Sequence, residues 1–199
     1  VMITSDLTER QMEEIRAVSE ENQVVVASTK EEMDKHLSDT EVFFGNLTRG
    51  MYEQTRKLRW VQTESAGVDS LMFDEFVGSD TLLTSAKGTV GTHLADHAMA
   101  LLLACNRRLF ILDSSVRSGD WLPIIPPPVG SLHGETLGIV GLGQIGRYMA
   151  RRAAAFEMDL IAADPYISDS VFGEYGATPV TLDELLRRSD YMSVHTPLT

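Results

Sequence analysis

Residues 138–146, which read GIVGLGQIG, constrain the fold of this chain more than any other segment. Gly141, Gly143 and Gly146 follow the spacing G-x-G-x-x-G, which joins a strand to a helix through a tight turn. An apolar strand precedes the turn, and the segment QIGRYMARRAAAFE follows it with apolar residues at helical spacing. Because such a turn links a parallel strand to the helix that covers it, the sequence predicts an α/β fold.

The first part of the chain repeats this alternation. Capping boxes at Thr8 with Gln11 and at Thr29 with Glu32 predict the starts of helices. Short apolar runs predict strands at 1–4, 24–27, 42–45, 59–63 and 81–85. Strands that alternate with short helices favour a parallel sheet covered on both faces.

The segment after residue 137 predicts strands before the glycine turn, at 159–164 and at 191–195. The helix between the last pair begins with a capping box, Thr181 with Glu184. It is expected to bury its leucines, Leu182, Leu185 and Leu186. This pattern corresponds to one mononucleotide-binding half of a doubly wound sheet, the first half of a Rossmann domain.

An incomplete doubly wound sheet would have an open edge. In the strand order 3-2-1-4-5-6, the strand before Gly141 is central, and we expect its neighbour on one side to come from an absent second half. An apolar strand with an open edge is a template for association. We therefore expect the chain to be a fragment of a longer protein and to associate in isolation.

The segment 93–110, HLADHAMALLLACNRRLF, is apolar nearly all round and predicts a buried helix that connects domains. We expect Cys105 to be buried within it. His93 and His97 resemble a metal-binding pair, but no third ligand is evident, so we predict a structural helix and no metal site. The proline-rich segment 121–131 is expected to be a surface loop.

The glycine turn also predicts a ligand. Backbone amides near Gln144 and Ile145 open a helix whose dipole favours an anion such as a pyrophosphate. Asp164 ends the next strand about 20 residues further on, where a ribose-binding acid is expected in a dinucleotide site. Its charge would repel a 2′-phosphate, which favours NAD over NADP; alternatively, Asp164 only caps the turn that follows it. His195 ends a later strand. A histidine at this position is a general base, a cofactor contact or merely a loop residue, and the sequence alone does not decide among them.

Composition excludes several classes of partner. The formal net charge is −12 and the pI about 4.8, which disfavours nucleic acid and anionic membranes. The longest apolar stretch, 98–105, is too short to cross a bilayer. A single cysteine cannot form an internal disulfide, which fits a reducing, cytoplasmic setting.

Several segments in order resemble the D-isomer-specific 2-hydroxyacid dehydrogenase family. They are LRWVQTESAGVDSL, ADHAMALLLACNRRL, LHGETLGIVGLGQIGRYMARRAAAF, IAADPY and TLDELLRRSDYMSVHTPLT. The resemblance implies a partial, flavodoxin-like substrate domain at 1–92, an interdomain helix at 93–112 and the first half of an NAD-binding Rossmann domain at 113–199. It also implies a homodimer that pairs largely around the connector helix. The family usually has glutamate where Asp96 stands, which we expect to matter little.

The resemblance assigns further residues. Ala66, Gly67 and Val68 would offer amides to a substrate carboxylate, although a glycine turn there could equally be only a turn. His195, Thr196 and Pro197 would border the adenosine side of the cofactor.

The implied activity is hydride transfer between nicotinamide and a small 2-hydroxy or 2-oxo acid. The family's catalytic arginine, histidine and acid lie beyond the segment that matches 195–199, so no residue here is assigned a catalytic role and we expect the fragment alone to be inactive. The alternatives are a non-catalytic NAD(H)-responsive protein, like the corepressors of this fold, and a protein that binds S-adenosylmethionine.

Overall fold

The computed structural model describes residues 1–121 and 129–196, so most of the expected proline-rich loop lies outside the described residues. The chain forms two compact units, Val1–Val90 and Gly91–Thr199. Each has its own parallel sheet and its own buried apolar cluster. The predicted α/β class with parallel sheets is confirmed.

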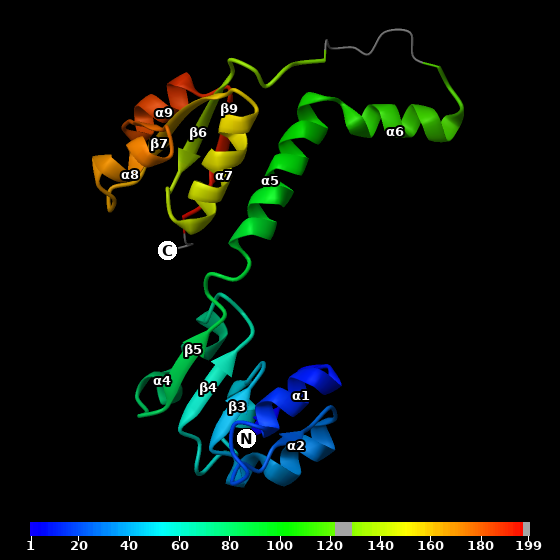
Figure 1. The fold of residues 1–199 in the computed structure, drawn as a ribbon, viewed down its shortest axis with the longest axis vertical. Helices are drawn as coiled ribbons and strands as arrows, with labels where there is room; N and C mark the ends of the chain where they lie inside the picture. Colours follow the sequence, from blue (N-terminus) through cyan, green and yellow to red (C-terminus); the bar gives the residue numbers. More distant parts are fainter. Residues whose placement is uncertain (122–128, 197–199) are drawn as a thin grey trace. The chain divides into compact units, whose positions relative to one another are not determined.

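The first unit contains a parallel sheet in the order β2-β1-β3-β4-β5, of which β3, β4 and β5 are labelled in Figure 1. Its strands are β1 (Met2–Ile3), β2 (Val25–Val26), β3 (Val42–Phe44), β4 (Trp60–Thr63) and β5 (Leu82–Ser85). This is the flavodoxin-like order, in which ligands bind beyond the carboxyl ends of the strands. That edge carries the loop with Gly67, directly after β4.

Short helices cover this sheet, and threonines start several of them. They are α1 (Glu9–Arg16), α2 (Lys30–His36), α3 (Arg49–Tyr52) and α4 (Asp74–Val77), with 3-10 turns η1 (Leu37–Asp39) and η2 (Asp69–Leu71). Two of the three predicted capping boxes, those at Thr8 and at Thr29, are formed, whereas at Thr181 only the bond to the threonine side chain is present. Phe43 and Val61 are fully buried in the core between sheet and helices.

The second unit holds a four-stranded parallel sheet in the order β8-β7-β6-β9. Its strands are β6 (Thr136–Val140), β7 (Asp159–Ala163), β8 (Thr178–Pro179) and β9 (Tyr191–Val194). The helices between them are α7 (Gln144–Ala155), α8 (Asp169–Glu174) and α9 (Leu182–Arg188). In the numbering of a doubly wound sheet this order reads 3-2-1-4.

Our expectation of an open edge beside the glycine turn was wrong. The sequence analysis did not predict α8 or the short β8. Pro179 in β8 argues against a strand unless the strand lies at the edge of a sheet, and β8 is such an edge strand. The strand taken as third is therefore the fourth, and it pairs with β6, with Leu137 opposite Tyr191. Strand β9 is the edge next to β6, and its Met192 and Val194 are exposed.

The helix expected over 93–110 is two helices, α5 (Gly91–Asn106) and α6 (Leu109–Ser118). Arg108 adopts a left-handed conformation between them, which ends the first helix. Helix α5 packs against α7 on one face only, and Leu101 on another is 49% exposed. Cys105 is also exposed, so our expectation that it is buried was wrong.

Helix α9 also differs from expectation. Thr181 caps it by accepting a hydrogen bond from the Glu184 amide. Leu185 is fully buried, whereas Leu182 and Leu186 are exposed, because only one face of this short helix lies on β6 and β7. The prediction that all of these leucines are buried was wrong for Leu182 and Leu186.

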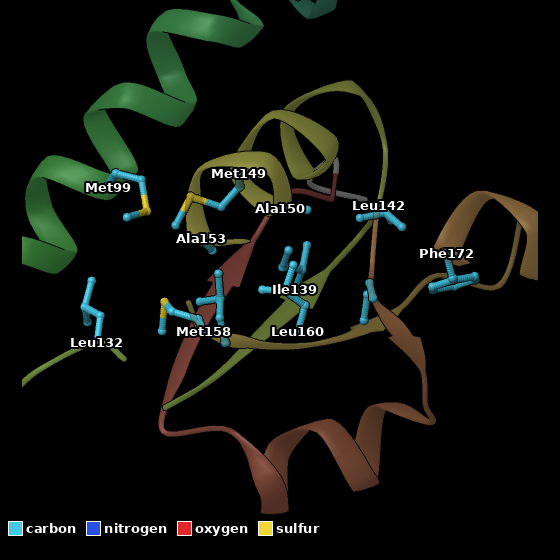
Figure 2. Close-up of a cluster of buried hydrophobic side chains, with 13 residues drawn as sticks. Met99, Leu132, Ile139, Leu142, Met149, Ala150, Ala153, Met158, Leu160 and Phe172 are labelled. Carbon is cyan, nitrogen blue, oxygen red and sulfur yellow. The ribbon is translucent and has the colours of Figure 1, made fainter. Parts of the chain in front are cut away.

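The core of the second unit lies between α5, α7 and the sheet (Figure 2). Met99 comes from α5, Met149 and Ala153 from α7, and Ile139 from β6. Leu142, from the glycine turn itself, belongs to the same cluster and is fully buried. The core therefore fixes the turn directly.

We predict that Gly138→Ala destabilises the second unit. A Cβ at Gly138 would lie 2.0 Å from Ser189 Oγ and 2.7 Å from Leu185 Cδ2, and the fully buried Leu185 cannot move freely. Overpacking of this kind costs about 1–3 kcal/mol in the free energy of unfolding. Denaturant unfolding measures the loss, with Gly173→Ala in α8 as control, because a Cβ there meets no atom within 4 Å. Equal stabilities of the two variants would contradict the prediction.

Candidate functional site

The three glycines of the turn have different surroundings. Gly141 has φ +87°, a conformation that side chains rarely allow. At Gly146 a Cβ would lie 2.2 Å from the Gly141 carbonyl oxygen, so α7 can approach β6 only with glycine there. At Gly143 a Cβ would meet nothing within 4 Å. The fold thus requires the first and third glycines, while the second leaves open space beside the helix start.

The start of α7 presents unpaired donors to this open space. Gly143 is the N-cap of α7. Within the part of the chain that the structure describes, the amides of Gly143, Ile145 and Gly146 donate to no other protein group. Free amides at the start of a 12-residue helix bind a phosphate through hydrogen bonds and the helix dipole. These residues therefore fit a pyrophosphate without a side-chain cation.

Asp164 follows β7 and is partly buried beside the turn. Its Oδ2 accepts a hydrogen bond from the Leu142 amide at 2.9 Å, and its Oδ1 accepts one from the Tyr166 amide at 3.0 Å. Asp164 thus caps the turn after β7, as the alternative interpretation held. Since each carboxylate oxygen has two lone pairs, it can still accept from a ribose hydroxyl.

A group of cationic and aromatic side chains lies on the other side of the turn. The Arg147 Nε donates to the Leu142 carbonyl oxygen at 3.0 Å. The guanidinium carbons of Arg147 and Arg151 lie 5.7 and 5.0 Å from the centre of the Tyr175 ring. Sequence reasoning missed this group, because Tyr175 follows α8, which had not been predicted.

His195 follows β9, next to Gly141. Its backbone amide donates to Val140, and its Nε2 lies 2.8 Å from the Ser193 hydroxyl. Burial lowers the pKa of the His195 imidazole below its ordinary value. A Cβ at Gly141 would lie 3.0 Å from the His195 carbonyl oxygen and from Thr196 Cγ2, so this segment borders the turn. Pro197 lies outside the described residues.

The loop after β4 presents a second set of amides in the first unit. The amides of Ala66, Gly67 and Val68 donate to no other described group. Gly67 has no positive φ, and a Cβ there would make only an ordinary contact, 3.4 Å from Asp69 Oδ2. The fold therefore does not require glycine at this position, and the amides are open to a ligand.

Two other features do not contribute to these sites. A cavity of about 1010 Å³ opens at the amino ends of β3, β4 and β5, beside Arg56 and Trp60, away from the loop edge. His93 and His97 are exposed on α5. Within residues 1–121 and 129–196, no group of three or more His, Cys, Asp or Glu is placed to hold a metal ion. Among the same residues, no helix is both long and apolar enough to cross a membrane.

Comparison with known proteins identifies the family. Residues 99–199 match the model of the D-isomer specific 2-hydroxyacid dehydrogenase, NAD binding domain. The chain belongs to this family, and NAD is the cofactor of the matched domain. The resemblance seen in the sequence is thereby confirmed.

Relatives and structures agree with this assignment. The chain is 31% identical to the D-3-phosphoglycerate dehydrogenase of Methanocaldococcus jannaschii, over 100% of this chain and 38% of that protein. It is 36% identical to the glyoxylate reductase of Korarchaeum cryptofilum, over 75% of this chain and 46% of that protein. The D-lactate dehydrogenase of Aquifex aeolicus, complexed with NAD and lactic acid, shares the fold, with a TM-score of 0.80 and 22% identity over 100% of this chain and 60% of that one. The chain spans less than half the length of these curated relatives.

We predict that Gly143→Val abolishes measurable NADH binding without unfolding the protein. The side chain would enter the open space beside α7 and exclude the pyrophosphate. The backbone of Gly143, with φ −69° and ψ −163°, suits any residue. We therefore expect the free energy of unfolding to change by no more than about 1 kcal/mol, the typical cost of a poor N-cap residue. Fluorescence titration with NADH and thermal unfolding measure the two effects. Unchanged NADH affinity would exclude this turn as the pyrophosphate site.

We predict that His195 makes the protein less stable in mild acid. Because its pKa is lowered in the folded state, the unfolded chain binds the proton first as the pH falls through about 6.5. The stabilising contribution is complete above that value and is lost below it. Between pH 7.5 and about pH 5, the unfolding temperature of the wild type should therefore fall more steeply with pH than that of His195→Gln. The same substitution at exposed His97 is the control, and parallel profiles of wild type and His195→Gln would contradict the prediction.

Proposed function

We propose that this chain is part of an NAD-dependent oxidoreductase that transfers a hydride between nicotinamide and a small D-2-hydroxy acid or 2-oxo acid. The observation that carries the proposal is the start of α7, where unpaired amides surround the open space at Gly143. The names of the relatives, phosphoglycerate dehydrogenase and glyoxylate reductase, support this class of substrate. NAD supplies the hydride acceptor or donor, and the protein supplies binding and orientation.

The proposed substrate contact is the loop after β4. The amides of Ala66, Gly67 and Val68 would hold the carboxylate of the acid, since backbone donors bind anions without a cation. The exposed Gly67, which the fold does not require, supports this role. The side chain of the acid is not specified by these backbone contacts.

The proposed cofactor contacts surround the glycine turn. Gly141, Gly143, Gln144, Ile145 and Gly146 would bind the pyrophosphate. The ribose of the adenosine would bind Asp164. The segment His195, Thr196 and Pro197 would border the adenosine.

The organisation of the whole protein is also a proposal. We assign 1–92 to the substrate domain, 93–112 to a connecting helix and 113–199 to the NAD-binding domain, supported by the division of the chain at Val90. A homodimer that pairs through α5 and α6 would cover exposed apolar side chains such as Leu101, Phe110 and Val116. The single cysteine supports a cytoplasmic location.

The test of this function is NADH oxidation by the natural polypeptide that contains these residues. Glyoxylate, hydroxypyruvate and pyruvate are offered in turn, and the intact mass of that polypeptide establishes its length. Turnover with one or more of these acids is the expected result. NADH binding without turnover of any 2-oxo acid would favour the non-catalytic, dinucleotide-responsive alternative.

We predict that Asp164→Ala reduces discrimination between NADH and NADPH. The carboxylate would lie at the ribose, where repulsion of a 2′-phosphate is worth about 1–4 kcal/mol. The substitution also removes the acceptor for the Leu142 amide, so both affinities should fall. The ratio of the dissociation constants isolates the charge effect, and we expect it to shift toward NADPH by roughly tenfold or more. An unchanged ratio would show that Asp164 only caps the turn.

A further inference from the structure

Leu142, which lies between Gly141 and Gly143, is held through its side chain, its amide and its carbonyl oxygen. Its side chain is fully buried in the core of the second unit (Figure 2). Its amide donates to Asp164 Oδ2 at 2.9 Å, and its carbonyl oxygen accepts from Arg147 Nε at 3.0 Å. The residue directly before the open space at Gly143 is thus fixed by three elements, β6 through the core, the end of β7, and α7.

Arg147 differs from its neighbour on the next turn of α7. Arg151 contacts Tyr175 through its guanidinium, with a hydrogen bond of 3.3 Å to the hydroxyl, and within the described residues it makes no hydrogen bond to the glycine turn. Arg147 lies near the same ring and also binds the Leu142 carbonyl. Tyr175 therefore restrains both arginines, but only Arg147 connects this restraint to the turn.

The Leu142 carbonyl matters for an anion because of its charge. A carbonyl oxygen beside the amides of Gly143 and Ile145 would repel a pyrophosphate if it turned toward them. A guanidinium that donates to this oxygen keeps it turned away and replaces its negative potential with a positive one. The amides then remain directed at the ligand before it arrives, which lowers the entropy lost on binding.

We propose that Arg147 is a positioning residue for the NAD pyrophosphate, acting through the Leu142 carbonyl. This inference rests on the assigned role of the glycine turn in cofactor binding. Arg147 itself need not touch the cofactor, and its contribution is the conformation of the turn in the free protein. The structure provides a matched control in Arg151, which shares the helix, the charge and the aromatic contact but not the bond to Leu142.

The experiment compares Arg147→Met, Arg147→Lys and Arg151→Met with the wild-type chain. Methionine keeps much of the aliphatic stem and the helix propensity but removes the donor and the charge. Lysine restores one charged donor. NADH affinity is measured by fluorescence titration, and hydrogen exchange of the amides of residues 141–146 is measured in the protein without ligand.

We expect Arg147→Met to weaken NADH binding by roughly tenfold and to accelerate exchange in the turn, the effect of losing one charge-assisted hydrogen bond. Arg147→Lys should recover part of both effects, and Arg151→Met should match the wild type in both. Unchanged exchange in Arg147→Met would overturn the inference, even with weaker binding, because Arg147 would then act by charge alone. Faster exchange with unchanged affinity would overturn it as well.

The outcome also separates this inference from the cofactor assignment. If the wild-type chain does not bind NADH, the cofactor assignment fails for this chain, and the positioning role fails with it. If the wild type binds NADH and Arg147→Met does so equally well, only the positioning role fails.

Discussion

The contact between Gly146 and Gly141 is the constraint on which the second unit depends. Any side chain at Gly146 would meet the Gly141 carbonyl oxygen at 2.2 Å, so α7 can lie this close to β6 only without one. The close approach places Met149 and Ala153 in the core, and the amides of Gly143, Ile145 and Gly146 at the start of α7 donate to no other described group. One steric requirement thereby creates both the packing of the domain and the arrangement of donors that we propose for anion binding.

The sequence predicted the features that depend on local interactions. The glycine turn follows from the conformational needs of single residues, and the capping boxes at Thr8 and Thr29 follow from hydrogen bonds within a few positions. Features that depend on distant partners were harder to predict. The two-residue strand β8 has no periodicity to detect. Because it was not predicted, β9 was counted as the third strand of the sheet instead of the fourth, and β6 was predicted to have an open edge. The prediction of which leucines α9 buries failed for the same reason, since packing on the sheet decides which of them are covered.

The candidate site likewise combines features that the sequence predicts locally with contacts that depend on distant residues. Spacing alone predicted cofactor-binding roles for Gly143 and Asp164. It did not predict that the Asp164 carboxylate accepts from the Leu142 amide, or that Arg147 donates to the Leu142 carbonyl oxygen. A hydrogen bond from Arg147 back to a residue five positions earlier has no sequence pattern, because it depends on the angle at which the turn enters the helix. Sequence reasoning predicted the site, and tertiary geometry was needed to find which contacts hold the turn.

Under the proposed function, a chain with a formal charge of −12 binds an anionic cofactor and an anionic substrate class. For each of them the proposal invokes backbone donors in place of a cationic patch, at Gly143 in one unit and at Gly67 in the other, where the amides donate to no other described group. Amide donors are fixed by the backbone, so they act at short range and do not attract other polyanions from a distance. In this proposal glycine serves only to give the ligand access at both positions, since the fold tolerates a Cβ at each. A net negative charge and anion binding are compatible in the proposed sites, because recognition would be carried by peptide groups whose direction the fold has already set.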